Sequence, residues 1–254
     1  MAAERGLAAA AATPYSGRMS EPSAHPFPWS AWAIHLLTAT GAVWAFLALL
    51  AVIDGDAQAV FLWLALALLV DGIDGPLARR FEVKARVPLF DGAALDLIVD
   101  YLTYVFVPVA FLWRFDLLPQ SLDLVGCAWV LLTSLHLFAK LDMKEPDNHF
   151  LGFPAVWNVV VLYLFLLDGG PWTNAAVVLA CGILTFLPVR FLHPFRVRRL
   201  RPVTVALTAG WGAAALWLVL AYPARPLFPL VLFLAASAWV AGLSLWRTVS
   251  GPWR

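Results

Sequence analysis

The chain has 254 residues, of which 62% are hydrophobic and 13% are charged. Because an average soluble domain carries about 25% charged residues, this composition excludes an ordinary soluble protein and indicates an all-α polytopic membrane protein. The formal net charge of +1 gives no reason to expect nucleic acid as a partner.

Residues 1–28 are rich in Ala, Pro, Ser and Gly, and they contain no apolar run long enough for the core of a signal peptide. Such a segment buries too little apolar surface to fold by itself, so we expect a disordered cytoplasmic tail. The following residues, 29–250, are expected to form one transmembrane domain.

Eight apolar segments make up this domain, and each approaches the roughly 20 residues that an α-helix needs to cross a bilayer. Short links containing Gly, Pro or charged residues separate them. The sequence therefore predicts eight transmembrane helices. Their approximate ranges are 30–52, 57–74, 89–113, 122–141, 151–167, 173–192, 202–221 and 226–246.

The distribution of Lys and Arg indicates the orientation of these helices. With the N-terminus inside, fifteen of the 17 basic residues fall on the inner side, and only Arg114 and Arg225 fall on the outer side. Cytoplasmic loops carry such an excess, and one missed or invented span would reverse every later loop. The sequence therefore predicts that both termini are cytoplasmic.

Four carboxylates interrupt the apolar pattern at regular spacings. Asp71 and Asp74 are three residues apart, and Asp96 and Asp100 are four apart, so each pair lies on one face of its helix. A single acid near a helix end usually just reaches the headgroup region. Four unpaired acids inside a membrane would cost on the order of 10 kcal/mol, which favours cations bound among them at the cytoplasmic side.

Small and basic residues accompany these acids. A missing side chain lets a ligand or another backbone approach closely, and basic groups beside a carboxylate cluster suit a metal-bound substrate that carries phosphate. The small residues are Gly75, Ala78, Gly92, Ala93 and Ala94, and the basic residues are Arg79, Arg80, Lys84 and Arg86. The basic residues beyond Arg79 are equally compatible with contacts to anionic lipid headgroups.

In order, these residues form the pattern Asp71-x2-Asp74-Gly75-x2-Ala78-Arg79-x12-Gly92-x3-Asp96-x3-Asp100. This pattern resembles the signature of the CDP-alcohol phosphotransferases, integral membrane enzymes of phospholipid synthesis. The resemblance implies a core of six transmembrane helices, so that the last two helices here are a C-terminal addition. It also implies a homodimer and makes 29–250 a catalytic domain.

The same resemblance implies a role for each acid. Asp71, Asp74 and Asp96 would be metal ligands, whereas Asp100 would accept the proton of the attacking alcohol and also touch the second of two divalent cations. Carboxylate oxygens favour Mg2+ or Mn2+ over Zn2+, and no His or Cys lies in the motif. By resemblance, the residues that line the CDP group are Gly75, Ala78, Arg79 and Gly92.

Twelve residues separate Arg79 from Gly92, a longer spacer than most members of the family have. In this respect, and in the stretches 150–158 and 193–201, the chain resembles the bacterial phosphatidylcholine synthase branch. That branch of inner-membrane enzymes joins choline directly to CDP-diacylglycerol and releases CMP. The resemblance covers most of residues 30–250.

Choline is a quaternary ammonium ion, and proteins hold such cations over aromatic faces. Tyr104 lies four residues after Asp100 and shares its helix face, while Trp157 and Asn158 lie in the expected fifth span. We expect these residues to line the choline pocket. Three acids of the preceding loop either balance the ammonium charge or form an exposed acidic loop: Asp142, Glu145 and Asp147.

Three further residues have simpler interpretations. Asp91 is expected to start a helix or to lie at the membrane interface, because its spacing from Asp96 does not place both on one face. Cys127 and Cys181 lie in apolar runs and are expected to be small core residues.

Two alternatives for the function remain open. One is a member of the same family with another acceptor, such as serine, inositol phosphate or glycerol phosphate, although anionic acceptors would require more basic residues at the site. The other is a transporter or channel, since acids inside a membrane also mark ion pathways. The acids here gather at one end of the helices, which favours an enzyme.

Overall fold

The computed structural model describes residues 28–140, 150–191 and 201–250. These residues form helices and one short pair of antiparallel strands. The helices are α1 (Trp29–Asp54), α2 (Ala57–Arg80), α3 (Val83–Arg86), α4 (Gly92–Tyr101), the π-helix η1 (Leu102–Phe106), α5 (Val107–Arg114), α6 (Asp123–Phe138), α7 (Trp157–Leu167), α8 (Pro171–Leu184), α9 (Arg201–Ala221) and α10 (Leu227–Ser250). The strands are β1 (Phe150–Leu151) and β2 (Arg190–Phe191).

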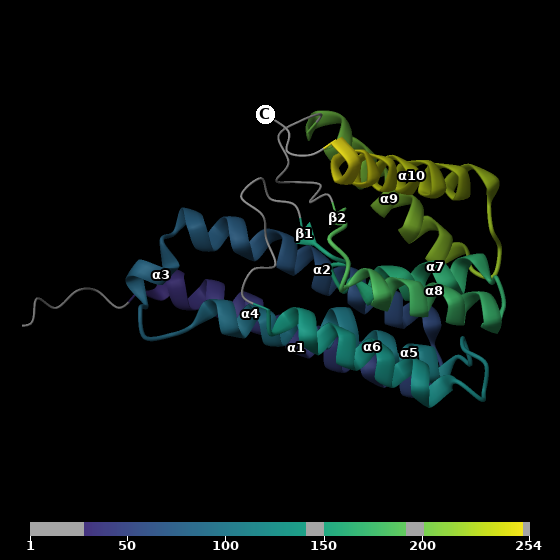
Figure 1. Ribbon diagram of the computed structural model, residues 1–254. Helices are drawn as coiled ribbons and strands as arrows, with labels where there is room; N and C mark the ends of the chain where they lie inside the picture. The colour runs from purple at the N-terminus through teal and green to yellow at the C-terminus, as the bar shows by residue number, and fades with distance from the viewer. Residues whose placement is uncertain (1–27, 141–149, 192–200, 251–254) are drawn as a thin grey trace, which may run out of the picture.

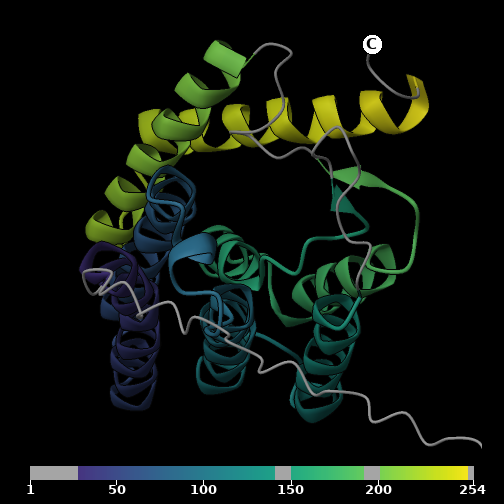
Figure 2. The ribbon, with the colours of Figure 1, turned by 90° about the vertical axis from the view of Figure 1, so that its left-hand side faces the viewer.

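The long helices of the first half run side by side (Figure 1), and Figure 2 shows them end-on. Helix α1 packs against both α2 and α4. Helices α9 and α10 pack against each other on one side of this group, and α10 crosses it at a large angle (Figure 2).

The third expected span is one continuous helical rod made of α4, η1 and α5. It begins where Asp91 caps it, with Oδ1 accepting hydrogen bonds from the backbone amides of Ala93 and Ala94 at 3.0 and 3.1 Å. The prediction that Asp91 starts a helix is therefore confirmed. Within the rod, the amide of Val107 donates to the carbonyl of Leu102, five residues earlier. Proline at 108 has no amide hydrogen for the usual α-helical bond, which explains a local change of bonding at this point.

The all-α polytopic class is confirmed. Among the described residues, five helical segments are long and apolar enough to cross a membrane: 29–54, 57–80, 92–114, 202–221 and 227–250. Helices α6, α7 and α8 are also apolar but have 16, 11 and 14 residues. Since an α-helix rises about 1.5 Å per residue, α7 covers only about half of a hydrocarbon core of about 30 Å. The described residues therefore contain five full-length candidate spans, and the count of eight stays a prediction.

Two expected helices are shorter than predicted because the segments that flank them, one before the first and one after the second, pair as strands. The segment expected to be helical from residue 151 becomes helical at Trp157, and the segment expected to end at 192 leaves the helix at Leu184. Leu151 instead pairs with Arg190 in the β1–β2 ladder. Gly152 has φ +89°, and a Cβ there would lie 2.5 Å from the carbonyl oxygen of Thr185, so only glycine fits this approach.

The second helix, in contrast, is longer than predicted. It was expected to end near residue 74 but continues to Arg80, with Pro76 inside it. Three residues of the motif beyond Asp74 therefore belong to a helix: Gly75, Ala78 and Arg79. This extension holds them on the same rigid element as Asp71.

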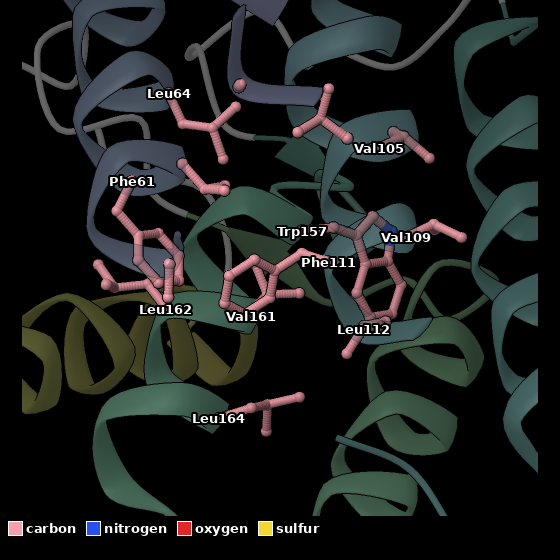
Figure 3. Packing of buried hydrophobic residues seen from close by; sticks show 14 of the residues in the cluster. Phe61, Leu64, Val105, Val109, Phe111, Leu112, Trp157, Val161, Leu162 and Leu164 are labelled. Carbon is pink, nitrogen blue, oxygen red and sulfur yellow. The ribbon is translucent and has the colours of Figure 1, made fainter. Parts of the chain in front are cut away.

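A single large apolar core joins the helices (Figure 3). Aromatic rings pack at its centre in tilted and edge-on geometry, with the ring of Phe111 4.8 Å from that of Phe61 and 5.5 Å from that of Phe165. Cys127 is buried in this core and Cys181 packs against it, both as free thiols, as expected.

The two C-terminal helices are tied to the rest by polar contacts. The side-chain amide of Gln58, at the start of α2, donates to the carbonyl of Val219 in α9 at 2.9 Å. The hydroxyl of Tyr163 in α7 accepts a hydrogen bond from the indole of Trp211 at 2.8 Å and is also bonded to Ser237 of α10. Helices α9 and α10 are therefore an integral part of the domain.

Candidate active site

Helices α2 and α4 bring three of the predicted acids together. One carboxylate oxygen from each of Asp71, Asp96 and Asp100 lies within 4.8 Å of the others, and all three residues are half-buried. Two oxygens on opposite sides of one Mg2+ ion, each about 2.1 Å from it, are about 4.2 Å apart. Small adjustments of these side chains would therefore let them share a cation.

The fourth acid, Asp74, lies at the same place but deeper. Its side chain is 5% exposed, and its Oδ2 accepts a hydrogen bond of 2.7 Å from the hydroxyl of Thr38 in α1. All four acids line one small cavity of about 10 Å3. That volume is close to the space of one water molecule, which fits a small ion. The structure thus brings the four predicted metal ligands together, and their oxygens match a hard divalent cation.

Tyr104 belongs to this cluster. Its hydroxyl donates a hydrogen bond of 2.5 Å to Oδ2 of Asp71, across from η1 to α2. The prediction from sequence paired Tyr104 with Asp100 on its own helix, whereas the structure joins it to the neighbouring helix. Its role toward choline remains a prediction.

The four residues expected to line the CDP group lie at the adjoining ends of α2 and α4. The guanidinium of Arg79 folds over Gly75, with Nη1 3.4 Å from the point where a Cβ on Gly75 would stand. A Cβ on Gly92 would lie 2.6 Å from Cε1 of His35 in α1. Ala78 packs against a small apolar cluster that α1 and α3 contribute. Along the chain, each of the four lies within five residues of one of the acids.

The other two residues expected near choline lie in the apolar core. Trp157 is fully buried, its indole donates to the hydroxyl of Ser134 at 2.8 Å, and Figure 3 shows it among Val105, Val109 and Leu112. Asn158 is 7% exposed, and its Oδ1 accepts from the amide of Val159. The structure does not place either side chain on the wall of the acidic cavity.

Outside the described residues lie the three acids of the loop, Asp142, Glu145 and Asp147, and all of the stretch 193–201 except Arg201. Among the described basic residues, Arg86 donates from Nη1 to the hydroxyl of Ser30 at 3.2 Å, whereas Arg80 and Lys84 are exposed. Sequence reasoning also missed Thr38 and His35. Their only signal was the presence of two polar residues, three positions apart, in a mostly apolar first span.

Comparison with known proteins places this site in a family. The sequence model of the CDP-alcohol phosphatidyltransferases matches residues 31–188, which include all four acids and most of the helical core. The chain belongs to the CDP-alcohol phosphatidyltransferase family. The family expected from the motif is therefore confirmed, and with it an enzyme rather than a transporter.

The curated relatives agree on one branch of this family. The chain is 49% identical over 218 residues to the phosphatidylcholine synthase of Pseudomonas aeruginosa, covering 86% of this chain and 92% of that protein. It is 40% identical to the phosphatidylcholine synthase of Brucella melitensis, covering 88% and 82%. It is 33% identical to the phosphatidylcholine synthase of Borreliella burgdorferi, covering 70% and 76%.

Proposed function

We propose that this enzyme transfers the phosphatidyl group of CDP-diacylglycerol to choline, giving phosphatidylcholine and CMP. The observation that carries the proposal is the meeting of Asp71, Asp96 and Asp100, from two separate helices, within 4.8 Å. This geometry occurs in a chain that is 49% identical to a phosphatidylcholine synthase over most of its length.

Four carboxylates are proposed to hold two divalent cations, Mg2+ or Mn2+: Asp71, Asp74, Asp96 and Asp100. Two such ions would bind the phosphate oxygens of the CDP-lipid and neutralise the charge that develops on the leaving CMP. The chain's own contribution is to fix the acids on α2 and α4. Asp74 is buried, whereas the other three are half-buried and so more accessible to a substrate.

Asp100 is proposed to act as the general base. A choline hydroxyl is a weak nucleophile until a positioned group accepts its proton. As that proton passes to the carboxylate of Asp100, the choline oxygen forms a bond to the phosphorus that carries diacylglycerol. The bond between this phosphorus and the oxygen of the CMP phosphate breaks in line with the attack, and CMP leaves.

The CDP group is proposed to lie over Gly75, Ala78, Arg79 and Gly92, beside the acids. Arg79 is exposed at the end of α2, where its planar guanidinium can reach phosphate. On the other side of Asp71, Tyr104 is proposed to face the ammonium group of choline. Trp157 and Asn158 are proposed to support this wall from behind, since α7 packs against η1.

For the topology we propose eight membrane segments with both termini in the cytoplasm of a bacterial inner membrane, residues 1–28 as a cytoplasmic tail and 29–250 as the catalytic domain. The three short helices would then reach only part of the way across the bilayer. The acidic site would face the cytosol, where choline and CMP are found, and the active form would be a homodimer. The distribution of basic residues supports this orientation.

The decisive experiment uses purified protein in detergent with CDP-diacylglycerol, Mn2+ and labelled choline. We expect label in phosphatidylcholine together with CMP release, both dependent on the CDP-lipid and the metal. Asp100→Asn should abolish both, because the amide cannot accept the proton. Label that enters lipid only from serine, inositol phosphate or glycerol phosphate would show a different acceptor, and no product with any acceptor would refute the proposal.

A further inference from the structure

Helix α1 carries no residue of the acidic motif, yet it is the element that joins the two acid-bearing helices. It packs against both α2 and α4, which are not themselves closely packed against each other. The contacts come from one face of α1, where His35, Thr38 and Gly41 follow at three-residue spacings. This face lies directly against the acidic cavity, because Thr38 and Gly41 line it.

Contacts on either side of Thr38 fix α1 relative to α4. One turn before it, the ring of His35 occupies the space that a side chain at 92 would need. One turn after it, Gly41 makes room for Val99, which lies between Asp96 and Asp100 in the sequence. The hydroxyl of Thr38 is therefore held at a fixed height beside α4.

The hydroxyl of Thr38 reaches across to α2. Its Oγ1 lies 2.7 Å from Oδ2 of Asp74, closer than the 3.3 Å to the carbonyl of Ile34 in its own helix. Both side chains are more than nine-tenths buried, at 8% and 5% exposure. A buried Thr usually satisfies its hydroxyl on its own helix. Here the shorter bond goes to a carboxylate 36 residues away.

We propose that Thr38 is a positioning residue for metal binding, holding the carboxylate of Asp74 toward the ions. The inference rests on the proposed role of Asp74 as a ligand. A donor on one carboxylate oxygen fixes the rotation of the group, so the other oxygen keeps one orientation. Partners that orient metal ligands in this way typically change metal affinity by about 10–100-fold when they are removed.

Binding of Mn2+ to the purified full-length protein, without substrates, tests this role directly. Free Mn2+ is counted by its electron paramagnetic resonance signal as the metal is titrated in. We expect Thr38→Val, which replaces the hydroxyl with a methyl group of similar size, to weaken Mn2+ binding by about ten-fold. Thr38→Ser keeps the donor and should bind Mn2+ nearly as the unaltered protein does.

Thr133 offers a matched control. It is 3% exposed, and its hydroxyl bonds to the carbonyl of Trp129 in its own helix at 2.8 Å. Thr133→Val should leave Mn2+ binding unchanged although it also removes a buried hydroxyl. Unchanged binding in Thr38→Val would overturn the proposal, as would equal losses in Thr38→Val and Thr38→Ser.

The same titration separates this inference from the proposed function. If the unaltered protein binds Mn2+ and Thr38→Val weakens it, but choline never enters lipid, then the choline reaction is wrong and the role of Thr38 stands. If choline transfer occurs and Thr38→Val binds Mn2+ normally, the choline reaction stands and the role of Thr38 is wrong. If the unaltered protein binds no Mn2+, the role of Thr38 is refuted together with the metal site.

Discussion

The hydroxyl of Tyr104 donates a hydrogen bond of 2.5 Å to Oδ2 of Asp71, so a π-helical residue of one rod touches a carboxylate of the neighbouring helix. This contact lies beside the three acids that meet within 4.8 Å. Tyr104 therefore has two expected functions. Its hydroxyl would orient Asp71, and its aromatic face would suit a quaternary ammonium ion.

Two variants of Tyr104 should separate these functions. Tyr104→Phe removes the hydroxyl and keeps the ring, so we expect a fall in kcat of about ten-fold with little change in the KM for choline. Tyr104→Leu should also raise this KM by about five-fold, because it removes the cation–π contact. Steady-state kinetics with varied choline measures both values. Equal KM values in the two variants would show that the ring does not bind choline.

Gly92 is expected to be intolerant of a side chain because of His35. In Gly92→Ala the new methyl group would lie 2.6 Å from Cε1 of a buried ring, and displacing the start of α4 should reduce kcat/KM for CDP-diacylglycerol by about a hundred-fold. The double variant His35→Ala/Gly92→Ala relieves the contact and should recover at least part of this loss.

Gly212 provides the control, since a Cβ there would meet nothing within 4 Å and Gly212→Ala should therefore be silent. No recovery in the double variant would mean that Gly92 is needed for the approach of the substrate and not for the packing of α1 on α4.

Asp91 and Asp96 lie close together in the sequence but are expected to have different roles. Substitution should distinguish these roles. Asn caps helices about as well as Asp, so Asp91→Asn should keep both activity and stability. Asp91→Ala should lower the free energy of unfolding by about 1 kcal/mol. Asp96→Asn removes the charge of a proposed metal ligand and should reduce activity by more than about a hundred-fold at unchanged thermal stability. A large loss of activity in Asp91→Asn would instead make it a fifth functional acid.

Gln58→Leu should loosen the C-terminal helices without touching the acidic site. The lost bond to the carbonyl of Val219 is expected to be worth about 0.5–2 kcal/mol in a membrane domain. The midpoint of thermal unfolding in detergent should therefore fall by about 1–8 °C. The exposed Gln120 is the matched position, and Gln120→Leu should not change the unfolding temperature. A shift of the same size in both variants would argue against a specific role of Gln58.

The candidate site could be predicted from sequence because its information is local. Spacings of three and four residues place Asp71 with Asp74 and Asp96 with Asp100, and the motif links the two pairs. What the spacing cannot supply is the contribution of other helices. Thr38 lies 36 residues before Asp74, and a Thr in an apolar span carries no signal of its partner.

The fold was predictable to a similar degree. Apolar runs located the helices, but the pairing of Leu151 with Arg190 is a contact between distant segments that no local pattern shows. It shortens α7 and α8, which were expected to be full spans. The π-helix had one local signal, Pro108, whose missing amide hydrogen disturbs the bonding of the turn before it.

The hydrogen bonds of Gln58 and Tyr163 to the last two helices have a practical consequence for dissecting this enzyme. In lipid, an apolar helix surface gains little free energy by exchanging lipid for a protein neighbour. A polar group that loses its hydrogen-bond partner there has no water to replace it. A truncation before α9 would remove the hydrogen-bond partners of the Gln58 amide and of the Tyr163 phenol. The shortest catalytically competent fragment of this protein should therefore retain residues 201–250.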